Sequence, residues 1–210
     1  MEGFTLSYAA CGEDLILKTI FGKGRRDGFY IDIGCNKPIQ NSNTFKLYLK
    51  GWSGICIDGN AGLVKKFKRI RKRDICLTEI VSGERREVIF YQDDVHHTLS
   101  TVDSAVGNAL KSGSGSVKEI RRHSRTLESI LEQHLFGTRI DLLSIDVERH
   151  DLEVLKGNDF EKYRPQIICT EWGGDPGSLK GTEVDVFLTG RGYEMLVFSS
   201  PNVFYVDKKI

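Results

Sequence analysis

Four short apolar runs along the chain each end on a carboxylate, and this pattern limits the fold more than any other feature. The runs "FYID", "GICID", "LLSID" and "IICTE" end at Asp32, Asp58, Asp146 and Glu171. Runs of this kind are typical of strands buried on both faces of a parallel sheet. The carboxyl ends of parallel strands meet at one edge, where open α/β folds bind ligands. A single aspartate there is usually a turn former or helix cap, but four in register indicate a site.

Helix-like segments separate the strand-like runs and complete the predicted fold. Strand–helix alternation predicts an α/β fold in which helices cover both faces of a parallel sheet. The last two runs, 193–199 and 202–207, are joined too tightly for a helical crossover, so they should form an antiparallel hairpin at one end of the sheet. The run 87–94 is expected as an outer strand. We expect helices at 41–51, 61–74, 126–135, 151–157 and 182–192.

The segment 92–125 interrupts this rhythm. It contains "HHTLSTVD" and then "KSGSGSVK", whose glycine and serine content is typical of flexible chain. We expect an insertion over the sheet edge that acts as a lid, with a featureless loop as the alternative. The 210 residues are enough for one sizeable core, so residues 1–210 are expected to form a single domain. That domain can equally be one part of a longer, multidomain protein.

Composition and charge exclude several classes of protein. The formal net charge is +1, so the whole chain is not typical of a nucleic-acid binder. No apolar run approaches the roughly 18 residues of a membrane span, and the basic stretch 65–74 is expected to be a solvated helix face. The five cysteines are an odd number without zinc-like spacing, and the N-terminus lacks the features of a signal peptide. The cysteines are therefore expected to be reduced thiols in a cytoplasmic protein.

The first strand–helix turn, "DIGCNKP", decides between kinds of nucleotide cofactor. Only Gly34 is present where a pyrophosphate would need several glycine amides at a helix N-terminus, so a dinucleotide is disfavoured. Asp58 ends the second strand, where an acid binds the two hydroxyls of an adenosine ribose. An adenosine cofactor without a pyrophosphate indicates S-adenosylmethionine.

Several stretches, taken in order, resemble the FkbM-type methyltransferases. These are "YAACGEDLIL", "GFYIDIGCNKPIQNSNTFKLYLKGWSGICIDGN", "TLESIL", "IDLLSIDVERHDLEVL" and "YRPQIICTEW". The resemblance runs from Tyr8 to about Trp172. It implies a Rossmann-like three-layer sandwich with a mostly parallel, seven-stranded sheet, and it implies S-adenosylmethionine-dependent methyl transfer.

The chain departs from the family pattern at three places. Ala9 and Ala10 replace a Ser-Gln pair, so any contact from that pair is lost. Cys35 stands where alanine is usual. Arg149 replaces the glycine of a "V-E-G-H" motif, and an arginine is not expected at a tight turn. It should instead narrow the site or bind an acidic part of the substrate.

The resemblance also implies which residues surround the cofactor. The first turn should enclose the methionine end, Asp58 should bind the ribose, and Ser82 should lie beside the adenine. For Asp58 the alternative is a cap on the following helix. The complete set implied is Asp32, Gly34, Cys35, Asn36, Asp58, Gly59, Asn60 and Ser82.

Transfer of a methyl group to a hydroxyl requires that the oxygen be aligned and its proton removed. Asp146, Glu148 and His150 are the candidate catalytic residues, and alternation along the strand aims Asp146 and Glu148 to one side. For His150 a local hydrogen bond at the helix entry is an equal alternative. Asp146 with Glu171 can also hold Mg²⁺ or Mn²⁺ through oxygen ligands. Arg149, His97 and Glu171 are the expected substrate contacts, although a histidine in an insertion, such as His97, is more often a solvated loop residue.

These features predict an O-methyltransferase that acts on a hydroxyl of a sugar or glycan. The stretch "SNTFKLYLKGW" resembles the form of this motif in family members that are linked to polysaccharide biosynthesis. The resemblance suggests a deoxyhexose acceptor such as rhamnose or fucose. The basic "KEIRRHSR", 118–125, can attract a phosphorylated or nucleotide-linked acceptor. A non-sugar acceptor, an inactive cofactor-binding module and an NAD-dependent sugar enzyme remain alternatives. The missing glycine fingerprint and the lack of a Tyr-x-x-x-Lys pair argue against the NAD-dependent enzyme. The oligomeric state stays open.

Overall fold

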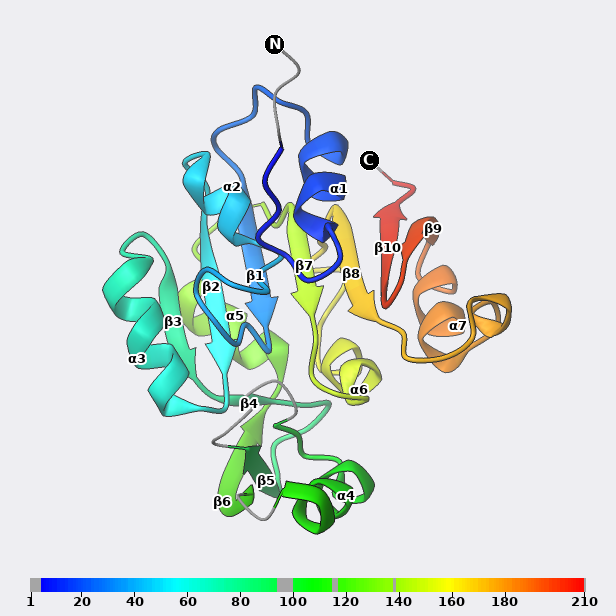
Figure 1. Cartoon of the computed structure of the whole chain (residues 1–210). Helices are drawn as coiled ribbons and strands as arrows, with labels where there is room; N and C mark the ends of the chain where they lie inside the picture. The colour runs from blue at the N-terminus through cyan, green and yellow to red at the C-terminus, as the bar shows by residue number, and fades with distance from the viewer. Residues whose placement is uncertain (1–4, 94–99, 115–116, 138, 210) are drawn as a thin grey trace.

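Five parallel strands and a C-terminal hairpin form one seven-stranded sheet, which confirms the predicted Rossmann-like α/β fold (Figure 1). The computed structural model describes residues 5–93, 100–114, 117–137 and 139–209. The strand order is β3-β2-β1-β7-β8-β10-β9. The strands are β1 (Phe29–Ile33), β2 (Ser53–Asp58), β3 (Ile75–Thr78), β7 (Leu142–Ile145), β8 (Ile167–Glu171), β9 (Tyr193–Ser199) and β10 (Asn202–Asp207).

The hairpin at the end of the sheet is confirmed, and its order adds a detail that the sequence did not predict. β10 pairs antiparallel with both β8 and β9, so the last strand lies inside the sheet and β9 forms the edge. The neighbouring pairs from β3 to β8 are all parallel. The ends of β1, β2, β7 and β8 therefore lie along one edge, as the four carboxylates predicted.

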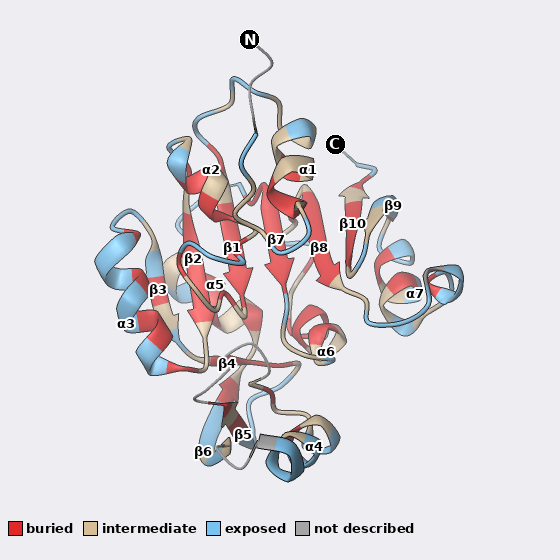
Figure 2. Ribbon diagram, viewed as in Figure 1, coloured by how far each residue is buried: buried red, intermediate tan, exposed pale blue. Residues whose placement is uncertain are grey.

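The central strands of the main sheet are buried along most of their length (Figure 2). Alternation along these strands divides the core into two clusters. Tyr30 of β1 packs in one cluster, while Ile31 and Ile33 pack in the other. The first cluster also contains apolar residues of α1 (Glu13–Ile20), α2 (Phe45–Leu49) and α3 (Ala61–Ile70). The second contains those of α5 (Leu127–His134), α6 (Asp151–Lys156) and α7 (Glu183–Thr189). Burial on both faces explains why the strands are apolar along their whole length.

A second, three-stranded sheet lies beyond the carboxyl edge of the first (Figure 1). It consists of β4 (Ile80–Val81), β6 (Val117–Arg125) and β5 (Glu87–Asp93), and α4 (Ser104–Ser114) packs beside it. The prediction of an outer strand at 87–94 in the main sheet was wrong, because β5 pairs along its whole length with β6. The apolar run at 75–82 is divided at Glu79, so that β3 belongs to the main sheet and β4 to the second sheet.

The described part of segment 92–125 therefore contains a strand and a helix, so the featureless-loop alternative was wrong. A role for this segment as a lid stays a prediction. A short 3-10 turn, η1 (Pro176–Ser178), precedes α7. The five cysteines are free. Among the residues that the structure describes, no helix combines the length and the hydropathy needed to cross a bilayer.

Candidate functional site

A cavity lies between the carboxyl edge of the main sheet and the second sheet. The ends of β1, β2 and β7 form one wall, and β4, β5 and the chain at 100–102 form the other. Its lining includes Gly34, Asn36, Asp58, Gly59, Ile80, Phe90, Thr101, Asp146, Glu148 and His150.

Gly34 brings the turn after β1 against the end of β7. Its φ of 76° is in the left-handed region that favours glycine, and a Cβ there would lie 1.8 Å from the carbonyl oxygen of Asp146. Asn36 follows with a φ of 49°. A close turn of this kind places Asn36 and Asp146 on the same cavity.

Asp58 is held in place by the backbone on both of its carboxylate oxygens. The Asn36 N–H donates to one oxygen at 2.9 Å, and the Asn60 N–H donates to the other at 2.7 Å. Burial raises the pKa of Asp58 to about 6, although these two hydrogen bonds act to lower it. Asp58 does not cap the next helix, because the side chain of Asn60 accepts from Gly62 and Leu63 there instead.

Asn36 also supplies an unused acceptor. Its side-chain oxygen Oδ1 is buried and has no hydrogen-bond partner among the described residues. An unpaired buried acceptor costs free energy, so a donor from a bound molecule would be favourable at this point of the cavity.

The apolar wall of the cavity was not predicted. Ile80 and Phe90 come from the second sheet and lie against Gly59, where a Cβ would meet their side chains at 2.6 and 2.7 Å. The only signal in the sequence was Glu79, which interrupts the apolar run before Ile80. Without knowing that β5 leaves the main sheet, this signal could not be interpreted.

Three carboxylates gather at the other end of the cavity. Single oxygens of Asp146, Glu148 and Glu171 all lie within 4.8 Å of one another. Asp151, which was not assigned a role, supports them, because its carboxylate accepts from the Val147 N–H at 3.2 Å and from the Glu171 N–H at 3.0 Å. It thereby ties the end of β7 to the end of β8.

Crowding and burial raise the pKa values of this cluster. Solvent reaches Asp146 through the cavity, yet protein surrounds it on most sides. Lost hydration, followed by the charges of Glu171, Asp151 and Glu148, raises the pKa of Asp146 well above its usual range. Lost hydration and then Glu171 raise the pKa of Glu148 to about 7. The cluster therefore binds protons more tightly than isolated carboxylates do.

The turn after β7 is strained at two successive residues. Glu148 and Arg149 have φ values of 53° and 71°, a region that costs about 1–2 kcal/mol for a residue with a side chain. The expectation that an arginine would not occupy a tight turn was wrong: the turn is kept, with Arg149 in the conformation that glycine favours. The Thr101 hydroxyl donates to the Glu148 carbonyl at 3.2 Å and helps to hold the turn.

His150 lines the cavity, and its side chain does not make the local hydrogen bond at the start of α6 that was the alternative. Its Nε2 lies 3.0 Å from the Ser82 hydroxyl, and burial lowers its pKa. Ser82 itself is buried and does not line the cavity, and the same holds for Cys35, Asp32 and Asn60. Glu171 joins the carboxylate cluster, but neither it nor the exposed Arg149 lines the cavity. His97 lies outside the described residues.

Comparison with known proteins gave one match. A family model described as "Methyltransferase FkbM domain" matches residues 32–195, which is more than half of the chain. Neither the curated proteins nor the solved structures gave a match.

The strain at Arg149 predicts that Arg149→Gly stabilises the protein. Relief of about 1–2 kcal/mol is partly offset by roughly 0.5–1 kcal/mol from the greater freedom of glycine in the unfolded chain. The melting temperature should rise by about 2 °C. Lys72→Gly, at an exposed turn position without a positive φ, is the matched control and should not raise it. A clear loss of stability in Arg149→Gly would mean that the arginine side chain stabilises the turn.

Proposed function

The chain belongs to the FkbM methyltransferase family, and from that premise we propose that it transfers a methyl group from S-adenosylmethionine to a hydroxyl of a sugar or glycan. One observation carries this proposal. A single cavity joins a carboxylate suited to ribose hydroxyls, Asp58, to a cluster of three carboxylates with raised proton affinity. The first end fits an adenosine cofactor, and the second fits the removal of a proton from an alcohol.

The residues of the cavity fit the cofactor at three points. Each carboxylate oxygen of Asp58 keeps a lone pair for a ribose hydroxyl, because each accepts only one backbone N–H. Ile80 and Phe90 offer an apolar surface for the adenine. The unpartnered Oδ1 of Asn36 accepts a donor from the methionine end. When bound, S-adenosylmethionine supplies a methyl group on a positively charged sulfur.

The task of the chain is to align the acceptor oxygen and to remove its proton. A sugar hydroxyl is a poor nucleophile near neutral pH. We assign the proton to Asp146, which lines the cavity and lies within reach of Glu148. Glu148, which also lines the cavity, holds the acceptor by a hydrogen bond. His150 orients the turn through Ser82 and is not required as the base.

The cluster of three carboxylates also supports a second way to activate the acceptor hydroxyl, with the help of a metal ion. Asp146 and Glu171, with Glu148 as a third ligand, present oxygens at a spacing that Mg²⁺ or Mn²⁺ accepts. A cation there would lower the pKa of the acceptor hydroxyl and remove the need for a free carboxylate base.

The acceptor is argued by analogy with the family. A deoxyhexose such as rhamnose or fucose, within an oligosaccharide of polysaccharide biosynthesis, is the first choice. Arg149 is exposed on the same turn as Glu148, so it is suited to an acidic group of the acceptor. A non-sugar acceptor is the alternative. We place the reaction in a reducing compartment, the cytoplasm, because the cysteines are free.

Asp58→Asn should weaken S-adenosylmethionine binding by about tenfold to a hundredfold, because hydrogen bonds to a charged group contribute about 1.5–3 kcal/mol. The affinity of the unmodified protein should also fall as pH drops below about 6, since a protonated Asp58 loses acceptor capacity. This pH effect should vanish in Asp58→Asn. Calorimetry measures both.

The control for that experiment is Asp27→Asn, because the Asp27 side chain is 92% exposed and precedes β1. It should bind the cofactor as the unmodified protein does. Binding of NAD without binding of S-adenosylmethionine would contradict the proposed function.

Asp146→Asn should lower turnover at least about a hundredfold while cofactor affinity changes little, because proton removal contributes about 10²–10⁴ in rate. Glu153→Gln, at a half-exposed carboxylate of α6 outside the cavity, should keep its turnover. Methyl transfer to an acceptor pool measures the rate. Full turnover in Asp146→Asn would remove Asp146 from the reaction, and cofactor binding without turnover in the unmodified protein would support an inactive module.

Treatment with EDTA separates the two routes of activation. If the carboxylates act as a base, turnover should persist after chelation and dialysis. If the cluster holds a cation, turnover should disappear and return on addition of Mg²⁺ or Mn²⁺.

A further inference from the structure

Arg71 is fully buried, although the basic stretch that contains it was expected to be a solvated helix face. Its Nε lies 3.1 Å from an Asp74 carboxylate oxygen, and the Asp74 side chain is also fully buried. The guanidinium lies 5.1–5.7 Å from the centroids of four aromatic rings, those of Tyr30, Phe45, Tyr48 and Phe67. A buried charge is costly unless it is paired and hydrogen-bonded.

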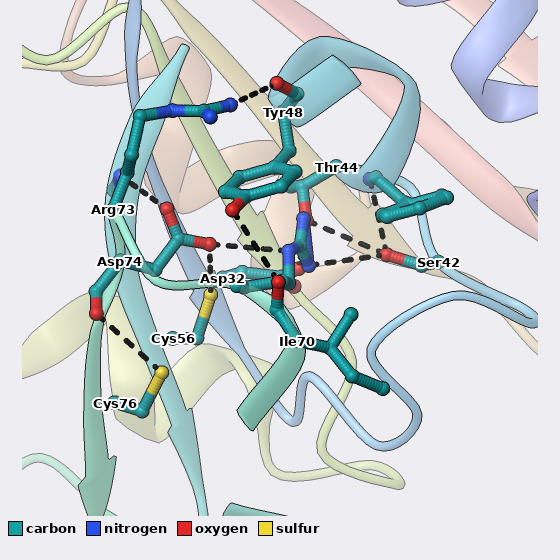
Figure 3. A network of polar contacts seen from close by, with 12 residues as sticks. Asp32, Ser42, Thr44, Tyr48, Cys56, Ile70, Arg73, Asp74 and Cys76 are labelled. Atoms are coloured by element: carbon teal, nitrogen blue, oxygen red, sulfur yellow. Dashed lines mark hydrogen bonds and ion pairs between the residues drawn. The ribbon is translucent and has the colours of Figure 1, made fainter. Parts of the chain in front are cut away.

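The Arg71 guanidinium is also connected to β1 by hydrogen bonds. Its Nη2 donates to the Thr44 hydroxyl at 2.7 Å, and the Thr44 hydroxyl lies 2.5 Å from Oδ2 of Asp32. A guanidinium can only donate, so the single proton of Thr44 must point to Asp32. Figure 3 shows Asp32, Thr44 and Asp74 around this shared cluster. Arg71, Thr44 and Asp32 therefore form a hydrogen-bonded relay, in which the guanidinium donates to the hydroxyl and the hydroxyl donates to the carboxylate.

Asp74 and Asp32 receive different support. Asp74 also accepts from the Tyr30 hydroxyl at 2.7 Å and from the Gly54 N–H at 3.0 Å. Asp32 is 5% exposed, and the Thr44 hydroxyl donates to its Oδ2. Burial raises the pKa of Asp32, while the charge of Arg71 and the bond from Thr44 lower it. The relay is therefore what favours an ionised Asp32.

Asp32 lies behind the turn at Gly34, close enough for its negative charge to influence groups in the cavity. It precedes Gly34 by two residues, and its charge acts to raise the pKa of both Asp58 and Asp146, which line the cavity. The methionine end of the cofactor carries an ammonium group, and an anion beside it is favourable in a poorly hydrated site.

We propose that Thr44 and Arg71 are positioning residues for the cofactor: through the hydroxyl of Thr44 they hold Asp32 ionised and oriented behind the turn at Gly34, from where its negative charge favours the cationic amino-acid end of S-adenosylmethionine in the cavity. This inference rests on the proposed function. It assigns the buried relay to one part of one ligand, which a purely structural role would not do.

Thr44→Val removes the hydroxyl and keeps the shape of the side chain. We measure calorimetric affinities for S-adenosylmethionine, S-adenosylhomocysteine and 5′-methylthioadenosine, which keeps the adenosine but lacks the amino-acid chain. Affinity for the first two should fall about tenfold or more, because a hydrogen bond to a charged group is lost. Affinity for 5′-methylthioadenosine should stay within about twofold. Thr44→Ser, which keeps the hydroxyl, should bind all three ligands with the affinity of the unmodified protein.

Each other outcome has a distinct meaning. Equal losses for all three ligands, or no loss, would overturn the positioning role and leave the proposed function intact. Failure of the unmodified protein to bind any of the three would overturn both. If Thr44→Val does not fold, Arg71→Lys provides the same comparison, because an ammonium cannot reproduce the fork that reaches both Asp74 and Thr44.

Discussion

The structure depends on how negative charge is accommodated at the carboxyl edge of the main sheet. Asp32, Asp58, Asp146 and Glu171 lie at the ends of four neighbouring parallel strands, and burial raises the pKa of each of them. Repulsion from neighbouring carboxylates adds to this effect for Asp58 and Asp146. Hydrogen-bond donors compensate for part of this charge.

The donors are distributed unevenly, and this distribution separates the carboxylates that are held by hydrogen bonds from those that we propose to be reactive. Two backbone N–H groups bind Asp58, two bind Asp151, and the Thr44 hydroxyl binds Asp32. The oxygens of Asp146, Glu148 and Glu171 are close together without donors of this kind among the described residues. A cationic cofactor, a proton shared with an acceptor hydroxyl, or a divalent cation would relieve the remaining repulsion.

The sequence predicted the parts that depend on strand periodicity and the ends of strands. Apolar runs ending at Asp58 and Asp146 sufficed to place both carboxylates on one edge, because parallel strands share their direction. It did not predict the partner of β5, since β6 lies beyond a helix and the pairing is not local. Ile80 and Phe90 were missed for that reason. Arg71 looked like a solvated residue of a basic stretch, and only tertiary packing shows that it is buried. Arg149 shows that a residue replacing glycine can keep the conformation of glycine at a cost in strain.

The most direct test of the central claim uses S-adenosylmethionine with a trideuterated methyl group. The protein is incubated with rhamnose- and fucose-containing oligosaccharides, and the products are analysed by mass spectrometry and fragmentation. The account predicts acceptors heavier by one trideuteromethyl group per transfer, attached to a sugar oxygen, and no such product with Asp146→Asn. Label on nitrogen or carbon, or labelled product that forms equally with Asp146→Asn, would contradict it.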